Sequence, residues 1–369
     1  MLAFVVYFCL LLHSLLYSII YQYEYKKLRS YWNLYIVIPI VVVSVVLGVR
    51  LGVGIDYDHY KNLYLNQLIY SDSISQFEPI YKSINQILFY WKLPYPILFI
   101  VILCIQQFFF YKTFKNMPYL LPWGVLSVFV LGTIFEQLNI MRQATAFYIF
   151  LSSIQYIKQR KLWKYISYIL LAIGFHYTSV ILLPLYFIGR IRRTFWDDYR
   201  LGLIIYVVTL LGGAYIFDNL LIIIQEVFSQ TPYFNYAPNL GIWMMEVHSG
   251  LGVLLFNLID IILIFYSRRL IQIYQKEGFI IYYRFYFLGI LFANIVGLDM
   301  VLARVPFALE SLRFVILAFC LDYVYRSWHT QNKYVRFCFC TMILVLLLVF
   351  VVDINNGSAG CAPYFFYGF

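Results

Sequence analysis

Four groups of polar residues in this sequence have the types and spacing that chemistry on a sugar or a phosphate would use. The first group follows an apolar stretch and runs from Arg50 through Gly52 and Gly54 to Asp56. Glycine tolerates positive φ, so these two positions allow a tight backbone turn beside a ligand. The carboxylate of Asp56 could bind a hydroxyl or accept its proton. Asp56 is therefore our first candidate for a catalytic base.

Tyrosines surround this acid at helical spacing. Tyr57, Tyr60 and Tyr64 would share one face of any helix in the segment. Phenols and carboxylates bind sugar hydroxyls, and aromatic faces stack on sugar rings. An aromatic belt at the membrane interface with a solvated acid explains the pattern equally well. We take Tyr57 and Tyr60 as candidate substrate-binding residues.

A second group is spaced i, i+3, i+4 and i+7, which predicts an amide, a guanidinium and a second amide on one helix face. Its members are Asn139, Arg142, Gln143 and Ala146. A guanidinium one turn inside a membrane helix suits a phosphate or pyrophosphate, and the alternative is snorkelling to the interface. The neighbouring amides favour the first interpretation. We predict pyrophosphate binding by Arg142 and substrate binding by Asn139 and Gln143.

Two further groups contain a histidine and a glutamate. His176 and Ser179 lie in a short polar break, where His176 is the second candidate base. A lone histidine is more often a satisfied core residue. Glu78 begins a segment that is too polar to cross a membrane, and a carboxylate at a helix start is ordinarily a helix cap. We retain Glu78 as a candidate substrate-binding residue.

Other charged residues lie within or beside apolar stretches. Arg50 and Arg304 are additional candidates for pyrophosphate binding. Glu310 and Arg313 are three apart, which predicts a structural salt bridge. Asp260 has no obvious partner in the sequence, and its role is left open.

The composition predicts that these residues belong to an integral membrane protein. The chain has 369 residues, of which 63% are hydrophobic and 12% charged. Apolar runs of about 20 residues recur, the length needed for a helix to cross the hydrocarbon layer. The fold class expected is all-α, a polytopic transmembrane helical bundle forming a single integral membrane domain over 1–369. Its ten full spans are expected near 2–20, 33–49, 95–111, 119–135, 139–157, 201–217, 250–267, 279–298, 306–325 and 335–352.

Lysine and arginine positions predict the orientation, because they concentrate in cytoplasmic loops. The N-terminus is then outside. The stretch 165–188 breaks the rule if it crosses once, since Arg190, Arg192 and Arg193 would lie outside. We therefore predict a short re-entrant helical hairpin there, with its tip near 174–178. The outer-face loops are then 50–94 and 218–249, and the segment 78–92 is an amphipathic helix at the outer interface.

The same pattern excludes several functions. The inner loops are short and carry no Gly-rich phosphate motif, which argues against an ATP-driven pump and against use of cytosolic nucleotide sugars. The net charge of +10 is dispersed in these loops, so no nucleic-acid partner is predicted. The six cysteines have no metal-binding spacing, so no metal site and no cofactor are expected.

In combination, the motifs resemble the EpsG-like family of bacterial exopolysaccharide and O-antigen (Wzy-type) polymerases. The resemblance covers residues 30–190, and little carries over from the second half apart from Arg304. The matching motifs are Arg50-x-Gly52-x-Gly54-x-Asp56-Tyr57-x-x-Tyr60, Glu78-Pro79-x-Tyr81-x-x-x-Asn85, Asn139-x-x-Arg142-Gln143-x-x-Ala146 and Leu171-Ala172-x-x-Phe175-His176-x-x-Ser179.

The resemblance implies a glycosyltransferase in a bacterial cytoplasmic membrane that joins polyprenyl-pyrophosphate-linked oligosaccharides at the outer face. These lipids would be both donor and acceptor. A chain-length regulator and a flippase of the same pathway are implied as further partners. The chain is also similar to C-superfamily membrane glycosyltransferases, in which an acid of the first outer loop often acts as base, a role that would fall to Asp56.

Three other functions fit the sequence. A glycan ligase would move the finished glycan to a lipid or protein acceptor. A flippase for the same lipid-linked unit would need polar residues in both membrane halves and usually internal repeats, whereas the polar candidates here lie on the predicted outer half. An outer-face acyltransferase would use a membrane histidine, but no histidine–acid pair is adjacent in the sequence.

Overall fold

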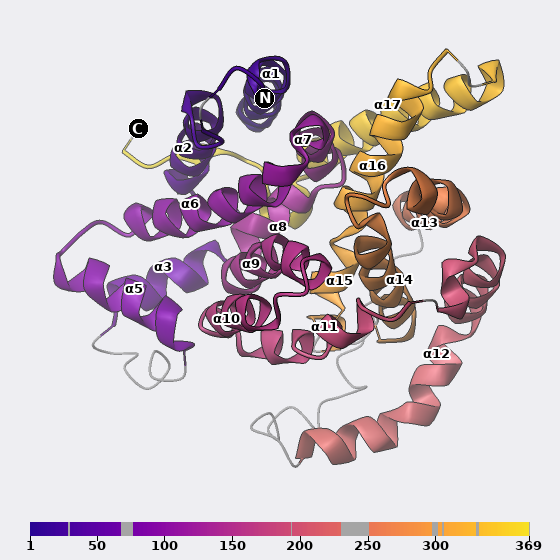
Figure 1. Cartoon of the computed structure of the whole chain (residues 1–369). Helices are drawn as coiled ribbons and strands as arrows, with labels where there is room; N and C mark the ends of the chain where they lie inside the picture. The colour runs from indigo at the N-terminus through magenta and orange to yellow at the C-terminus, as the bar shows by residue number, and fades with distance from the viewer. Residues whose placement is uncertain are drawn as a thin grey trace. The chain divides into compact units, whose positions relative to one another are not determined.

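The computed structural model of the chain describes residues 1–28, 30–67, 77–192, 194–229, 251–296, 302–304, 306–329 and 332–368. Arg29, Arg193, residues 230–249 of the predicted second outer loop, and 299–301 and 305 of the following turn lie outside the described residues. The described chain is helical apart from its loops and two strands of two residues each. The predicted all-α class is therefore confirmed (Figure 1).

The chain divides into two compact units, residues 1–186 with 321–369 and residues 187–320. The first unit contains α1 (Leu2–Glu24), α2 (Leu34–Gly48), β1 (Arg50–Leu51), α3 (Tyr57–Leu65), α5 (Pro79–Tyr90), α6 (Pro96–Thr113), η1 (Phe114–Asn116), η2 (Pro118–Leu120), α7 (Leu121–Val130), α8 (Thr133–Asn139), α9 (Met141–Lys158), α10 (Leu162–Ile173), η3 (Tyr177–Leu182), α17 (Lys333–Asn356), η7 (Ser358–Gly360) and β2 (Phe365–Phe366).

The second unit is built from the middle of the chain. It contains η4 (Phe195–Asp197), α12 (Tyr199–Ser229), α13 (Leu251–Ile273), α14 (Phe279–Val296), η6 (Leu302–Arg304) and α15 (Phe307–Glu310). The short α11 (Leu185–Ile188) and α16 (Arg313–Arg326) include the two points where the chain passes from one unit to the other.

Each unit packs around its own apolar core. In the first unit α6 lies between α2 and α9, α9 also contacts α10, and α1 contacts α2 and α7. In the second unit α12 contacts α13 and α14, and α14 contacts α15. A Cβ atom at Gly289 would come within 2.3 Å of the Glu310 backbone nitrogen, so α14 and α15 approach closely only because this residue is glycine.

The count of full spans differs from the ten expected. Among the described residues, five helices are long and apolar enough to cross a membrane, and a sixth span results if α7 and α8 are counted together. These two helices meet at an angle of 66° because Gly132, at φ 68°, ends the first helix in the left-handed region. The predicted span 306–325 is likewise interrupted, between Glu310 and Arg313.

Two other boundaries were predicted wrongly. The span expected at 139–157 begins at Met141, because Ile140 is non-helical and Asn139 ends α8. Asn139 and Arg142 therefore do not share a helix face. The span expected at 201–217 continues to Ser229, so α12 extends into the predicted outer loop.

The stretch 165–188 forms the expected pair of short helical arms. α10 ends at Ile173, the chain is non-helical around His176, and η3 and α11 follow. The second arm returns beside the first, since the Tyr165 hydroxyl donates to the Leu182 carbonyl at 2.5 Å. The position of this hairpin in the membrane stays a prediction, as does the orientation of the whole chain.

A loop in the second unit is closed by a buried ion pair. Arg284, 1% exposed, donates to both oxygens of Asp197 at 2.9 and 2.6 Å. The same carboxylate accepts from the backbone nitrogen and hydroxyl of Thr194. Burial alone would raise the pKa of Asp197, but these bonds and the Arg284 charge outweigh it and hold the pKa below its ordinary value.

We predict that this pair makes the second unit sensitive to acid. Because the folded-state pKa is depressed, its stabilisation is present above the ordinary aspartate value and is lost as the pH falls through the folded value. Asp197→Asn should cost about 3 kcal/mol at neutral pH, since it leaves Arg284 unbalanced. Thermal unfolding of the purified protein from pH 3 to 8 measures both effects. The matched control is Asp198→Asn at the exposed neighbour, and equal behaviour of the two variants would contradict the assignment.

Candidate active site

The carboxylate of Glu78 joins two of the predicted functional residues. Its Oε2 lies 2.7 Å from Arg142 Nη1, and its Oε1 lies 3.0 Å from His176 Nδ1. The same Oε1 accepts from the Tyr177 backbone nitrogen at 3.3 Å. Glu78 is 3% exposed, whereas Arg142 and His176 retain 25% and 17% of their side-chain exposure. The acid is therefore buried beneath a cation and an imidazole that reach the surface.

Three breaks in helical structure place these residues together. Glu78 precedes α5, where Pro79 occupies the first helical position. Arg142 lies in the first turn of α9, directly after the break at Ile140. His176 is extended, at φ −158°, in the gap between α10 and η3. The alternative role of Glu78 as a helix cap is not observed, because its side chain makes no cap hydrogen bond.

Aromatic rings form the wall around Arg142. Its guanidinium carbon lies 4.8 Å from the centre of the Phe77 ring and 5.7 Å from that of Tyr81. Tyr60 packs edge-on against Tyr81. Burial raises the pKa of Tyr60, and the Arg142 charge acts in the opposite direction, so Tyr60 also lies within electrostatic reach of the guanidinium. A cation held over aromatic faces is suited to a ligand that carries both charge and sugar rings.

The electrostatics keep Glu78 ionised. Burial alone would raise the pKa of Glu78, but the hydrogen bond with His176 and the positive charge of Arg142 outweigh it. The pKa of this carboxyl is therefore held below its ordinary value. An ionised Glu78 can accept a hydrogen bond from the protonated Nδ1 of His176. In that neutral tautomer Nε2 is the ring nitrogen that carries a lone pair.

Two nitrogen atoms at this site are buried and unsatisfied within the described part of the chain. They are Nε2 of His176 and Nε of Arg142. Buried polar atoms nearly always have a partner. Both atoms belong to residues that contact Glu78, so the unsatisfied nitrogens cluster around this carboxylate.

Arg50 is used in a different way from that predicted. It is fully buried and lies 4.6 Å from the centre of the Phe99 ring. It donates to the carbonyls of Leu47, Val53 and Leu138, each at 2.9 Å. These bonds fix the turn in which Gly52 and Gly54 both have positive φ, as the sequence predicted. The geometry supports a structural role for Arg50 in place of pyrophosphate binding.

Asn139 connects three segments that are distant in sequence. Its Oδ1 accepts from the Ile55 backbone nitrogen at 2.6 Å, and its Nδ2 donates to the Ala359 carbonyl at 2.9 Å. The tail also pairs with the first loop directly, through β1 with β2 and through Gly54 N to Gly360 O at 2.8 Å. Asn139 thus holds the backbone beside Asp56, and its amide groups are occupied by that task.

The remaining predicted residues have simpler surroundings. Asp56 precedes α3, is half-buried, and its carboxylate makes no hydrogen bond to a described residue. Tyr57 is buried, with its hydroxyl 2.6 Å from that of Tyr95. Gln143 is buried near the start of α9. Arg304 is exposed at the end of η6, in the second unit.

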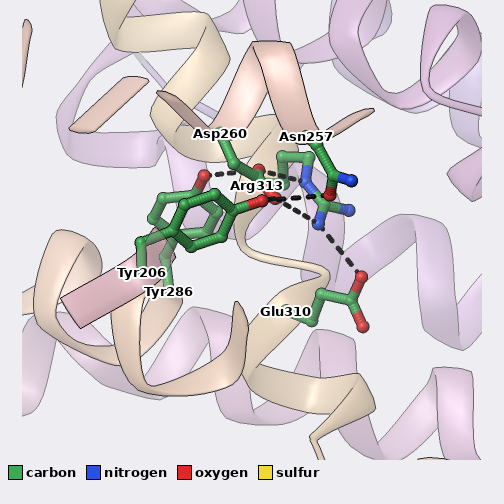
Figure 2. A network of polar contacts seen from close by, with 6 residues as sticks. All are labelled: Tyr206, Asn257, Asp260, Tyr286, Glu310 and Arg313. Carbon is green, nitrogen blue, oxygen red and sulfur yellow. Dashed lines mark hydrogen bonds and ion pairs between the residues drawn. The ribbon is translucent and has the colours of Figure 1, made fainter. Parts of the chain in front are cut away.

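The second unit contains its own charged network (Figure 2). Arg313 contacts Asp260 at 2.7 Å and Glu310 at 3.0 Å. The predicted pairing of Glu310 with Arg313 is confirmed. Asp260, whose role the sequence left open, is the main partner of Arg313.

With this geometry established, the chain can be compared with known proteins. A sequence model of the EpsG family matches residues 33–366, nearly the whole chain. The chain belongs to the EpsG family. EpsG proteins are Wzy-like polysaccharide polymerases, so the resemblance found in the motifs is confirmed. No match was found among curated proteins or among solved structures.

Sequence reasoning missed the organising role of Glu78 in this EpsG-family chain. The carboxylate is 64 residues from Arg142 and 98 from His176, so spacing could not show that the three meet. A usable signal was present, since an arginine at the start of an apolar helix is costly unless an acid pairs with it. Glu78 lies in the first polar loop, directly before the helix that begins at Pro79, and it is the acid that pairs with both residues.

We predict strong energetic coupling between Glu78 and Arg142. Glu78→Ala should destabilise the fold by about 3 kcal/mol because it leaves a partly buried guanidinium unbalanced. Arg142→Ala in the same background should add much less than it costs alone. Chemical denaturation of the single and double variants in detergent gives the coupling free energy. Additive losses would show that the two side chains do not form the pair.

We further predict that Asn139 maintains the contact between the first loop and the tail. Asn139→Ala should speed hydrogen exchange at the Ile55 amide and along residues 357–366. Asn33→Ala is the matched control, because this amide also bonds backbone groups but at the start of α2. Exchange in both segments should be unchanged in the control. Unchanged exchange in Asn139→Ala would contradict the role.

Proposed function

We propose that this protein is a membrane glycosyltransferase that polymerises polyprenyl-pyrophosphate-linked oligosaccharide repeat units into a surface polysaccharide at the outer face of a bacterial cytoplasmic membrane. Membership of the EpsG family supports polymerisation. The observation that carries the site assignment is the Glu78 carboxylate, which holds Arg142 and His176 together. The product would be an exopolysaccharide, a capsule or an O-antigen.

The reaction joins a sugar hydroxyl to an anomeric carbon. The terminal hydroxyl of one lipid-linked unit attacks the anomeric carbon of another chain, a C–O bond forms, and the bond from that carbon to the pyrophosphate breaks. The hydroxyl proton passes to a base, and the bond electrons leave with the pyrophosphate. Pyrophosphate is a good leaving group, so the step needs no general acid and no nucleotide.

His176 is the base that the geometry favours. Its Nδ1 faces an ionised carboxylate, which orients the ring and fixes the tautomer. Its Nε2 is buried without a described partner and has a free lone pair in that tautomer. Asp56, first in our sequence prediction, is a competing base whose carboxylate is unpaired among the described residues. Glu78 acts here through His176 and Arg142, so it is a positioning residue.

Arg142 is proposed to bind the departing pyrophosphate. Only Nη1 of its guanidinium is bonded to Glu78, and the side chain keeps a quarter of its exposure. A preorganised cation aimed at growing negative charge lowers the barrier, typically by a factor of about 100 to 1,000 per group. Tyr60 and Tyr81 are buried and would hold the Arg142 guanidinium in place. Arg304, in the other unit, remains a second pyrophosphate candidate.

The contacts within the first unit support one common side for these groups. The start of α1, the end of α2, the start of α9 and the end of α17 are tied together. The bonds include Tyr7 to Cys361, Tyr364 to Val46 and Asn139 to Ala359. In the predicted orientation the basic loops lie at the opposite ends of these helices, which supports the proposal of an outer-face site and an external N-terminus.

We predict that Arg142→Ala and His176→Ala abolish long polysaccharide without loss of protein. Loss of a base lowers rates by about 100- to 10,000-fold, which is enough to erase a ladder of chain lengths. A strain lacking the protein is complemented with each variant, and its polysaccharide is resolved on a gel while its polyprenyl-linked glycans are analysed by mass spectrometry. Single repeat units on the outer face are expected.

Two pairs of variants decide between the bases. Asp56→Asn is compared with Asp58→Asn at its exposed neighbour, and His176→Ala with His59→Ala on α3. A normal ladder in His176→Ala with none in Asp56→Asn would reverse our assignment. Units trapped on the inner face would indicate a flippase, and polyprenyl-linked chains of full length that fail to reach their final acceptor would indicate a ligase.

A further inference from the structure

A second group of buried charges lies in the unit formed by residues 187–320. Asp260 on α13 receives a two-pronged contact from Arg313, with distances of 2.7 and 3.0 Å. It also accepts from the hydroxyls of Tyr286 at 2.6 Å and Tyr206 at 3.3 Å. Asp260 is 3% exposed and Arg313 14%. This core of the network is balanced in charge and saturated at the carboxylate.

Two other residues of the network, Glu310 and Asn257, have polar atoms that are not needed to balance the Asp260–Arg313 pair. Glu310 contacts Arg313 through Oε1 only and retains 33% of its exposure. Asn257 accepts from Tyr206 through Oδ1, and its amide nitrogen makes no bond to a described residue. Arg313 likewise has no described partner at Nη1. Figure 2 shows the Asn257 amide nitrogen and the unbonded Arg313 nitrogen on the same side of Asp260.

The chemistry of these open groups identifies a class of ligand. Two N–H donors and a carboxylate oxygen match hydroxyl groups, which both accept and donate hydrogen bonds. The two carboxylates outnumber the single guanidinium, so the network is net negative and disfavours a phosphate or pyrophosphate. The Phe256 ring lies 5.3 Å below the guanidinium and adds an aromatic surface at the same place.

We propose that Asn257, Glu310 and Arg313 bind an uncharged sugar residue of the glycan. This inference rests on the proposed function, because it assigns a second carbohydrate subsite to the same enzyme. A repeat-unit polymerase has to hold an acceptor glycan as well as a pyrophosphate-linked donor. The Glu78 site would provide the cation that binds the pyrophosphate. The Asp260 network, in another part of the sequence, would bind an uncharged sugar. Polar groups placed within apolar helices commonly mark such substrate sites.

The test uses a ligand without phosphate. The repeat-unit oligosaccharide is released from its lipid by mild acid, and its binding to the purified full-length protein in lipid nanodiscs is measured by saturation-transfer NMR and calorimetry. Asn257→Ala and Glu310→Gln should each weaken binding by about tenfold. Glu310→Gln keeps an oxygen for Arg313, and neither change removes Asp260 or Arg313, so both variants should fold.

Asn294→Ala is the matched control, because this amide in the same unit already donates to Thr209 at 3.1 Å. It should bind the oligosaccharide as wild type does. Arg142→Ala separates this inference from the proposed function: it should lose polymerisation and still bind the free oligosaccharide. Wild-type binding by both Asn257→Ala and Glu310→Gln would overturn the subsite, while a lost ladder in Arg142→Ala would leave the polymerase assignment standing.

Discussion

The proposed active site depends on one buried carboxylate. Glu78 is almost fully enclosed, yet it remains ionised because an arginine and a histidine both bond to it. Each of those partners would be costly alone in an apolar surrounding, and the carboxylate is likewise costly without them. Their mutual dependence fixes three segments at one point. It also leaves the Nε2 atom of His176 and the Nε atom of Arg142 buried without a partner among the described residues.

Broken helices are what allow this arrangement. Continuous membrane helices satisfy their own backbones and present mainly side chains to one another. Here α7 and α8 bend at Gly132, α9 restarts after Ile140, and α10 ends before His176. Each break places a polar residue at a helix end, where backbone groups are also free to be bonded. Arg50 and Asn139 then bond the exposed carbonyls and amides, so that the first loop and the tail are held beside the site.

The sequence predicted the helical class, the family and the short helical arms of the 165–188 stretch. It also singled out Arg142 and His176, whose roles stay predictions. These features follow from the composition, from the helical spacing of apolar and polar residues, and from short sequence motifs. It did not predict the helix ends around Gly132 and Ile140. Gly132 follows an apolar run, and Asn139, Arg142 and Gln143 have helical spacing across Ile140, so the sequence pattern shows neither break. The contacts of Glu78 and the partnership of Asp260 with Arg313 also could not be read, since they join residues more than 50 positions apart. Arg50 was predicted to bind pyrophosphate from its place in the first-loop motif, whereas it is buried and bonded to three backbone carbonyls, which supports a structural role.

The most direct test asks whether Glu78 and His176 act as one unit in the reaction. Initial polymerisation rates would be measured with purified protein and lipid-linked repeat units for Glu78→Gln, His176→Ala and the double variant. If Glu78 orients His176, the loss in the double variant should be far smaller than the product of the two single losses, because His176→Ala removes much of what Glu78 supports. Losses that multiply in the double variant would show that the two residues act independently, and the account of the site would be wrong.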